Sequence, residues 1–306
     1  MLSELLEWLT PARVESVAIA LGGAVIGTFG GAYGGAVAAE QIAAKKARRA
    51  RIEQEIRDTN AAIELSFTVC SLCIGLKSQH VQQLVAEFLR QQQIVHKVCA
   101  DMERGIVPTS EQMEIGFVDH LVLENLWLPT SRLEQTVLEK INARGRISQL
   151  AISVARCVEG LDDSISKRNA LIERYLDGSI KSEEKQYRTF GYPMKDGSVD
   201  MTYSNLTVGL LAKTDNCIYF SKQLCARLSE HGKEIKRTSP RRLQKSLPKV
   251  LRADFEHPSQ RHLMPDPKEF SGWEIAFAPR PRASKGRYFY KAKYILRRSW
   301  RHFIGL

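Results

Sequence analysis

Four side chains of the type that binds zinc stand in two pairs in the first third of the sequence. Cys70 and Cys73 form a Cys-x-x-Cys pair, and His96 with Cys99 could complete a set of four ligands. The twenty-two residues between the pairs carry a helical pattern, and a straight helix of that length holds the pairs more than about 30 Å apart. We therefore expect no metal and no cofactor, and interpret these cysteines as small hydrophobes of a packed core.

Other sets of reactive residues lack the spacing that catalysis requires. Residues 75–78 (GLKS) have neither the upstream glycine nor the adjacent Gly-Lys of a phosphate-binding loop. His262, Asp266 and Glu269 could be imagined as a catalytic set, but they fall in a proline-rich stretch that indicates a surface loop. The sequence has no zinc-protease motif, nucleophile elbow, dinucleotide fingerprint or calcium loop. It indicates a protein that is not an enzyme, with an unrecognised site in residues 179–281 as the alternative.

The C-terminal segment combines cations with aromatic rings. Residues 275–306 carry nine Lys or Arg and no acid, and residues 235–253 carry seven and no acid, which leaves twenty-nine basic against thirty-four acidic residues elsewhere. Aromatic side chains among cations suit an interfacial helix on an anionic leaflet. They also suit single-stranded nucleic acid, and a solvated tail is the third interpretation. We favour anionic lipid headgroups as the partner. The expected contact residues are Lys291, Lys293, Arg297, Arg298, Trp300 and Arg301.

One long uncharged stretch lies near the N-terminus. Residues 16–39 hold no ionisable group except the phenol of Tyr33, and as a helix they cover about 36 Å, enough to cross a bilayer. A cleaved signal peptide and a buried soluble helix are the alternatives, but the acidic segment before the stretch is unlike the basic start of a signal peptide. Small residues recur at every fourth position, which lets membrane helices approach closely and predicts a homo-oligomer. This glycine zipper consists of Gly23, Gly27, Gly31, Gly35 and Ala39.

The charges on either side of this stretch give the expected orientation. One arginine precedes it, whereas six basic residues follow it closely. The positive-inside rule then places the N-terminus outside the cell and the bulk of the chain, with the C-terminus, in the cytoplasm. The six basic residues are Lys45, Lys46, Arg48, Arg49, Arg51 and Arg57.

The remaining pattern predicts an all-α fold. From Ile56 to Met102 apolar residues follow heptad spacing, with interruptions at Asn60, Lys77 and Gln91. This pattern is typical of a coiled coil or a long bundle helix. No glycine or proline separates the membrane stretch from Gly75, and one glycine in a helix costs only about 1 kcal/mol. We therefore expect one helix to continue from the membrane into a long stalk.

Turn and capping residues mark the other expected elements. A second long helix should begin at a Ser131–Glu134 capping box, kink at Gly145 and end at Asp177-Gly178. The pair Asp196-Gly197 should form one small hairpin. The further expected elements are a loop at 104–112, a short helix at 113–127, irregular chain at 179–203, a third long helix at 204–237, one short helix at 241–254 and a basic helix at 284–303.

Three parts follow from these elements. Residues 1–44 form the lead-in and membrane helix, residues 45–237 a cytoplasmic bundle of long helices, and residues 238–306 a proline-rich segment with a basic tail. We predict a non-enzymatic, single-pass membrane protein that self-associates as a scaffold or signalling component. One alternative is a membrane-perturbing, pore-forming effector, such as a bacterial defence component. The other is a membrane-tethered protein that binds nucleic acid through its basic tail.

Overall fold

The computed structural model describes residues 11–107, 120–143, 145–255 and 258–276, and for residues 11–36 it describes the backbone alone. These residues form helices and connecting segments, with no strand among them. The expected all-α class is therefore confirmed for the part of the chain that is described.

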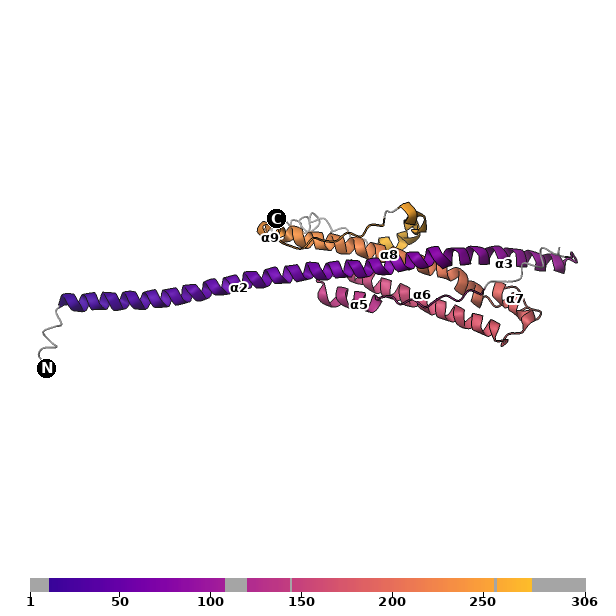
Figure 1. Cartoon of the computed structure of the whole chain (residues 1–306), viewed down its shortest axis with the longest axis horizontal. Helices are drawn as coiled ribbons and strands as arrows, with labels where there is room; N and C mark the ends of the chain where they lie inside the picture. Colours follow the sequence, from indigo (N-terminus) through magenta and orange to yellow (C-terminus); the bar gives the residue numbers. More distant parts are fainter. Residues whose placement is uncertain (1–10, 108–119, 144, 256–257, 277–306) are drawn as a thin grey trace, which may run out of the picture.

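One helix dominates the molecule (Figure 1). It comprises α2 (Pro11–Leu76), the π-helical turn η1 (Lys77–Val81) and α3 (Gln82–Glu103), which follow one another without a break. Proline is tolerated in the first turn, where its missing N–H has no intrahelical partner. The helix ends where Gly105 takes a φ of 77° and donates to the Met102 carbonyl at 3.0 Å. The predicted passage of one helix through Gly75 is confirmed.

Two further long helices complete the bundle. They are α8 (Thr202–Thr238), which lies against both other helices, and α6 (Arg146–Leu176). Helix α8 runs antiparallel to α2: Ser66 Oγ donates to the Ser221 carbonyl at 2.9 Å, and Cys225 Sγ to the Ile63 carbonyl at 3.6 Å. The third predicted helix, 204–237, is thus confirmed to within two residues at each end.

The heptad seam of the first helix is largely buried by the same chain. Its members that pack in the core are Ile56, Ile63, Cys70, Ile74, Val81 and Phe88. By contrast, Phe67 and Met102 are 39% and 58% exposed. Because α8 of the same chain lies along the central part of the seam, this pattern is explained without a second copy of the chain.

The polar residues that interrupt the seam each bind another group. Asn60 Nδ2 donates to the Lys249 carbonyl at 2.8 Å, and its Oδ1 accepts from Leu251 N at 3.0 Å. Lys77 pairs with Asp215, and Gln91 Nε2 donates to a neighbouring carboxylate on its own helix at 2.7 Å. A buried polar group must find such partners or destabilise the core.

The short helix expected at 113–127 is wrong over residues 120–127, which run without regular structure along α6. The backbone there binds side chains instead of itself. Leu123 N donates to Asn169 Oδ1 at 3.3 Å, and Asn169 Nδ2 donates to the Leu123 carbonyl at 2.6 Å. Leu126 N donates to Asp162 Oδ1 at 3.1 Å. Residues 120–129, which we call the strap, are thus an extended segment on the bundle, although their apolar residues are spaced as in a helix.

The second long helix is broken where a kink was expected. It begins as α5 (Thr130–Gln135) and η3 (Thr136–Lys140), and no side-chain capping bond forms at its start, so the predicted capping box is wrong. Ile141 is extended, and Gly145 takes a φ of 76°, a conformation that suits glycine, before α6 begins. The predicted end is confirmed, because α6 stops at Leu176 and Gly178 has a φ of 79°.

Residues 179–203 are more ordered than predicted, since α7 (Ser182–Phe190) forms within them. The turn at Asp196-Gly197 is present, with Met194 N donating to the Ser198 carbonyl at 2.8 Å, but without flanking strands. The remaining elements are short: α9 (Arg241–Gln244), η4 (Pro258–Leu263), η5 (Pro267–Phe270) and α10 (Ser271–Ala276).

Candidate functional site

The residues of zinc-binding type do not meet. Cys70 and Cys73 are buried in the bundle, and Cys70 Sγ donates to the Ile218 carbonyl of α8 at 3.6 Å. His96 lies farther along the same continuous helix, where its Nε2 is 3.0 Å from the Phe190 carbonyl. Within the described ranges no cluster of three or more His, Cys, Asp or Glu side chains could hold a metal ion.

Five of the six cysteines gather in the bundle from three helices. They are Cys70 and Cys73 of α2, Cys157 of α6, and Cys217 and Cys225 of α8. Burial raises the pKa of the Cys70 thiol and raises the pKa of Cys157 to about 11. A hydrogen bond with Cys73, together with burial, raises the pKa of Cys217. Thiols with raised pKa values stay protonated at neutral pH and are poor nucleophiles, which agrees with the core role inferred from the sequence.

The other sequence candidates have structural roles. Lys77, which stands in the GLKS segment, is 7% exposed and binds Asp215 and the Leu263 carbonyl in the bundle interior. It is therefore not placed to hold a phosphate. Asp266 caps η5 by accepting from Lys268 N at 2.9 Å, while His262 and Glu269 are exposed.

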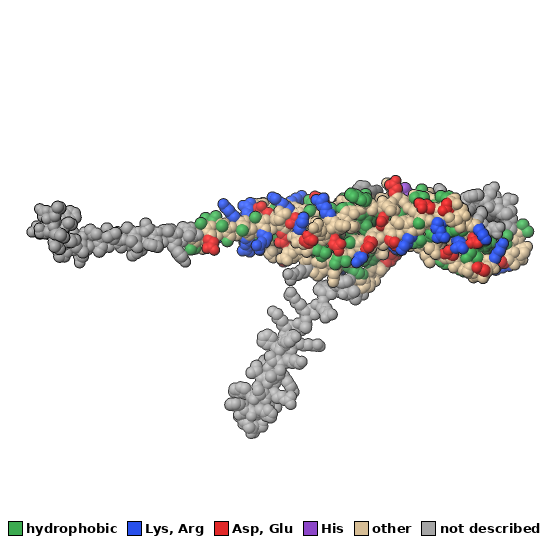
Figure 2. Space-filling model, turned by 90° about the horizontal axis from the view of Figure 1, so that it is seen from below, with side chains coloured by type: hydrophobic (Ala, Val, Ile, Leu, Met, Phe, Trp, Pro, Cys, Tyr) green, Lys and Arg blue, Asp and Glu red, His purple; other side chains and the backbone are tan. Residues whose placement is uncertain are grey.

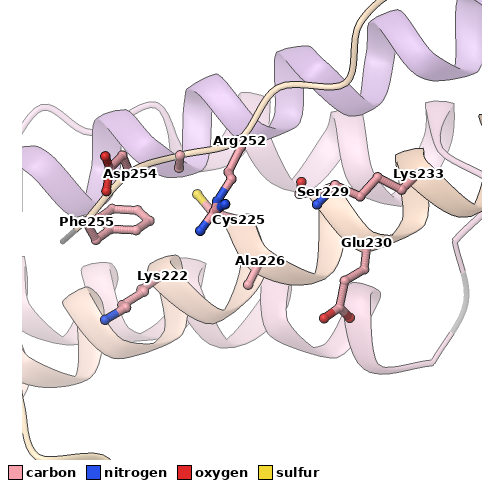
Figure 3. A pocket seen from close by; sticks show the side chains of 10 residues that line it. Lys222, Cys225, Ala226, Ser229, Glu230, Lys233, Arg252, Asp254 and Phe255 are labelled. Atoms are coloured by element: carbon pink, nitrogen blue, oxygen red, sulfur yellow. The ribbon is translucent and has the colours of Figure 1, made fainter.

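A cleft of about 290 Å³ lies between α8 and residues 252–255 (Figure 3). Its charged lining has both signs, from Lys222, Glu230, Lys233, Arg252 and Asp254. Two nucleophilic side chains also line it. Burial raises the pKa of the Cys225 thiol to about 11, and Ser229 Oγ donates to the Leu251 carbonyl at 3.0 Å. The cleft thus presents no activated nucleophile for catalysis.

One unpredicted side chain is the guanidinium of Arg168, which is fully buried. Its three donors reach neutral acceptors: Leu121 O at 2.7 Å, Tyr203 Oη at 3.0 Å and Thr207 Oγ1 at 3.3 Å. Burial lowers the pKa of Arg168. The residue thus joins α6, α8 and residues 120–129. The spacing of apolar residues around Arg168 does not predict that it links these segments.

One helix in the described part of the chain is long and apolar enough, by length and composition, to cross a membrane: Val37–Glu103. Of its apolar window, 44% is buried inside the protein, as in the core helix of a bundle. The side chains of the glycine zipper before Val37 lie outside the described residues, although Gly23, Gly27, Gly31 and Gly35 all belong to helical backbone. The zipper's last member, Ala39, is exposed. The membrane assignment of residues 16–39 therefore rests on the sequence.

The basic tail residues that the sequence predicts as lipid or polyanion contacts, from Lys291 to Arg301, also lie outside the described residues.

Residues 37–51 of α2, which we call the neck, join the glycine-rich stretch to the bundle. Every residue of the neck is exposed, so no other element of the described part of the chain covers this helix. It carries five basic residues and one acid, Glu40. The basic residues are Lys45, Lys46, Arg48, Arg49 and Arg51.

A second basic run, residues 236–249, returns to the same end of the bundle (Figure 1). Asn60 holds the backbone at Lys249 and Leu251, as described above. Gly232 of α8 leaves the space for this crossing, because a Cβ there would lie 2.8 Å from Val250 Cγ1. Gln244 Nε2 donates to the Ser239 carbonyl at 2.8 Å, which folds α9 back on the end of α8. Nothing in the sequence indicates that these two basic runs are neighbours; the fold brings them together.

No protein-family model matches this chain, and no curated protein or solved structure is significantly similar to it.

Proposed function

We propose that the protein is a non-enzymatic, single-pass membrane protein whose glycine-rich helix self-associates and whose cytoplasmic bundle acts as a scaffold or signalling module. The observation that carries the proposal is the unbroken helix from Pro11 to Glu103. It makes the glycine-rich stretch and the central helix of the bundle one mechanical element. A change in packing at Gly23–Ala39 would therefore displace the bundles that the helices carry.

The burial pattern supports a division of labour along this helix. The seam residues that are buried between Ile56 and Phe88 lie in the core beside α8 of the same chain, so that part of the heptad seam is already occupied. The neck is exposed along its whole length, and the zipper has the small residues that close helix packing in lipid needs. We accordingly place self-association in residues 16–51, a narrower segment than the coiled-coil stalk expected from the sequence.

The zipper is tested by cross-linking the full chain in membranes that express it. Replacing Gly27 and Gly31 by leucine should abolish oligomers, because two large side chains on the seam hold the helices apart. The control variant V25L/F29L introduces the same two leucines on the opposite side of the helix and should retain the oligomers. Unchanged oligomers in G27L/G31L would refute the packing role.

The proposed orientation has the N-terminus outside the cell, since the basic neck follows the membrane stretch. An epitope tag before Met1 should then be digested by protease added to intact cells. A tag that survives until the cells are opened would reverse the topology.

A pore-forming effector remains the second candidate because the glycine-rich stretch could assemble with several copies. Release of a dye trapped in vesicles that contain the full chain distinguishes the two functions. We expect no release from the wild-type protein. Release that G27L/G31L abolishes would replace the scaffold by the effector.

A further inference from the structure

We propose that the end of the bundle nearest the neck binds the anionic lipid headgroups of the leaflet that the chain crosses. The surface, called the basic collar, combines exposed cations of two segments far apart in sequence. It consists of Lys45, Lys46, Arg48, Arg49 and Arg51 of the neck and of Arg237, Arg241, Arg242, Lys245 and Lys249. This inference rests on the proposed membrane helix, and it concerns residues other than the basic tail.

The collar is held together by the fold. Because α8 is antiparallel to α2 and Gly232 lies beside Thr59, the last turn of α8 extends about 9 Å farther toward the neck. Asn60, through its two bonds to residues 249–251, fixes the other end of the second run to α2. Figure 2 shows Lys and Arg side chains gathered where the described surface meets the grey N-terminal part.

Few collar cations form an ion pair within the described part of the chain. Arg49 pairs with Glu53 at 2.7 Å and Arg237 with Glu234 at 2.7 Å, both within one helix. For the other eight, the described part of the chain offers no carboxylate within 4.0 Å. Like charges that are gathered without counter-charges repel one another, so an external polyanion stabilises the arrangement.

The position of the collar selects a lipid surface among polyanions. Lys45 follows Ala39 by six residues, which is about 9 Å along a helix and within the headgroup region beside the hydrocarbon core. Cations that lie within about one Debye length, roughly 10 Å at 0.1 M salt, feel the potential of an anionic leaflet. Tilting of the exposed neck brings the more distant α9 cations to the same surface. Docking would then set the angle between the bundle and the membrane.

The test measures how close α9 lies to the lipid surface. The full chain with Ser246→Cys, which is exposed, carries a fluorescent donor, and vesicles carry an acceptor on a lipid headgroup. Energy transfer should be higher in vesicles with 30% phosphatidylglycerol than in pure phosphatidylcholine, and the difference should vanish at about 1 M salt, where the Debye length is about 3 Å. Equal transfer in both lipids would overturn the proposal.

Charge-reversal variants identify the residues responsible. R241E/R242E/K245E should lower transfer in anionic vesicles to the zwitterionic level, because each basic residue near such a surface contributes about five-fold to the docking equilibrium. The control K97E/R156E/K167E changes the net charge equally on exposed residues outside the collar and should leave transfer unchanged. A loss of transfer in both variants would show a general charge effect and refute the collar.

Two further measurements keep this proposal separate from its premise. If carbonate extraction removes the protein from vesicles, the premise that the chain crosses the membrane is wrong. If the protein resists extraction but energy transfer is the same in anionic and zwitterionic vesicles, only the collar proposal is wrong. Binding of a DNA oligonucleotide that the collar variant loses, without any lipid effect, would assign the collar to nucleic acid instead.

Discussion

Lys77 Nζ lies 2.6 Å from Asp215 Oδ1, in an ion pair between η1 and α8 whose side chains are 8% and 16% exposed. The same ammonium donates to the Leu263 carbonyl at 2.9 Å, so one side chain joins the first helix, the antiparallel helix and the η4 segment. Lys77 is also the first residue of the π-helical turn η1. Turns of this kind interrupt the regular α-helical ladder and are frequent at positions with a special role.

Removing one partner of this pair should destabilise the protein strongly. We expect Lys77→Met to lower the free energy of unfolding by about 3–5 kcal/mol, because Asp215 is left as an unpaired buried charge. The double variant K77M/D215L should recover much of the loss, since it removes both charges from the core. Denaturant unfolding of the full chain in mild detergent, followed by circular dichroism, measures these changes.

An exposed pair on α6 provides the control for that experiment. Lys167 Nζ lies 2.8 Å from Asp163 Oδ2, and both side chains are more than half exposed. Lys167→Met should change the free energy of unfolding by less than about 1 kcal/mol. Similar losses for the two lysine variants would mean that the buried pair contributes no more than a surface pair.

The helical elements could be predicted because their signals are local. Heptad spacing and the lack of helix breakers predict the helix that includes residues 56–102, and Asp177-Gly178 predicts the end of α6. The strap at 120–129 could not be predicted in this way. Its apolar spacing suits a helix, but its backbone is satisfied by Asn169 and Asp162, side chains about forty residues farther along the chain.

The candidate site was harder to predict for the same physical reason. The sequence shows that Asn60 and Lys77 interrupt an apolar seam, yet their partners lie 189 and 138 residues away. The neck cations were interpreted as an orientation signal and those of 235–253 as part of a basic C-terminal region. The two groups of cations come together because the chain reverses its direction after α8. The helical periodicity of the sequence does not predict that reversal.

Two glycines of α8 should respond in opposite ways to the same substitution. Gly232→Ala should lower the free energy of unfolding by about 1–2 kcal/mol, because the added Cβ must displace Val250, and overpacking outweighs the gain in helix propensity. At Gly209 nothing lies within 4 Å of the added Cβ. Gly209→Ala should raise the free energy of unfolding by up to about 1 kcal/mol. Thermal unfolding of both variants, compared with the wild type, tests the fit of residues 249–251 on α8, and equal shifts would contradict it.

Alkaline pH should weaken the bundle through its buried thiols. Burial raises the pKa of Cys225 from 9.0 to about 11, so its contribution to stability is fully present below pH 9. Between pH 9 and 11 the unfolded chain releases the proton and the folded chain keeps it, so the free energy of unfolding falls as pH rises, by about 2–3 kcal/mol over the full window. Denaturant midpoints measured at pH 8 and pH 10 should therefore differ less in Cys225→Ala than in the wild type. Cys99→Ala, which alters a half-buried thiol of α3 and leaves the bundle thiols in place, should keep most of the wild-type difference. A Cys225→Ala protein as sensitive to pH as the wild type would show that this thiol is not buried in solution.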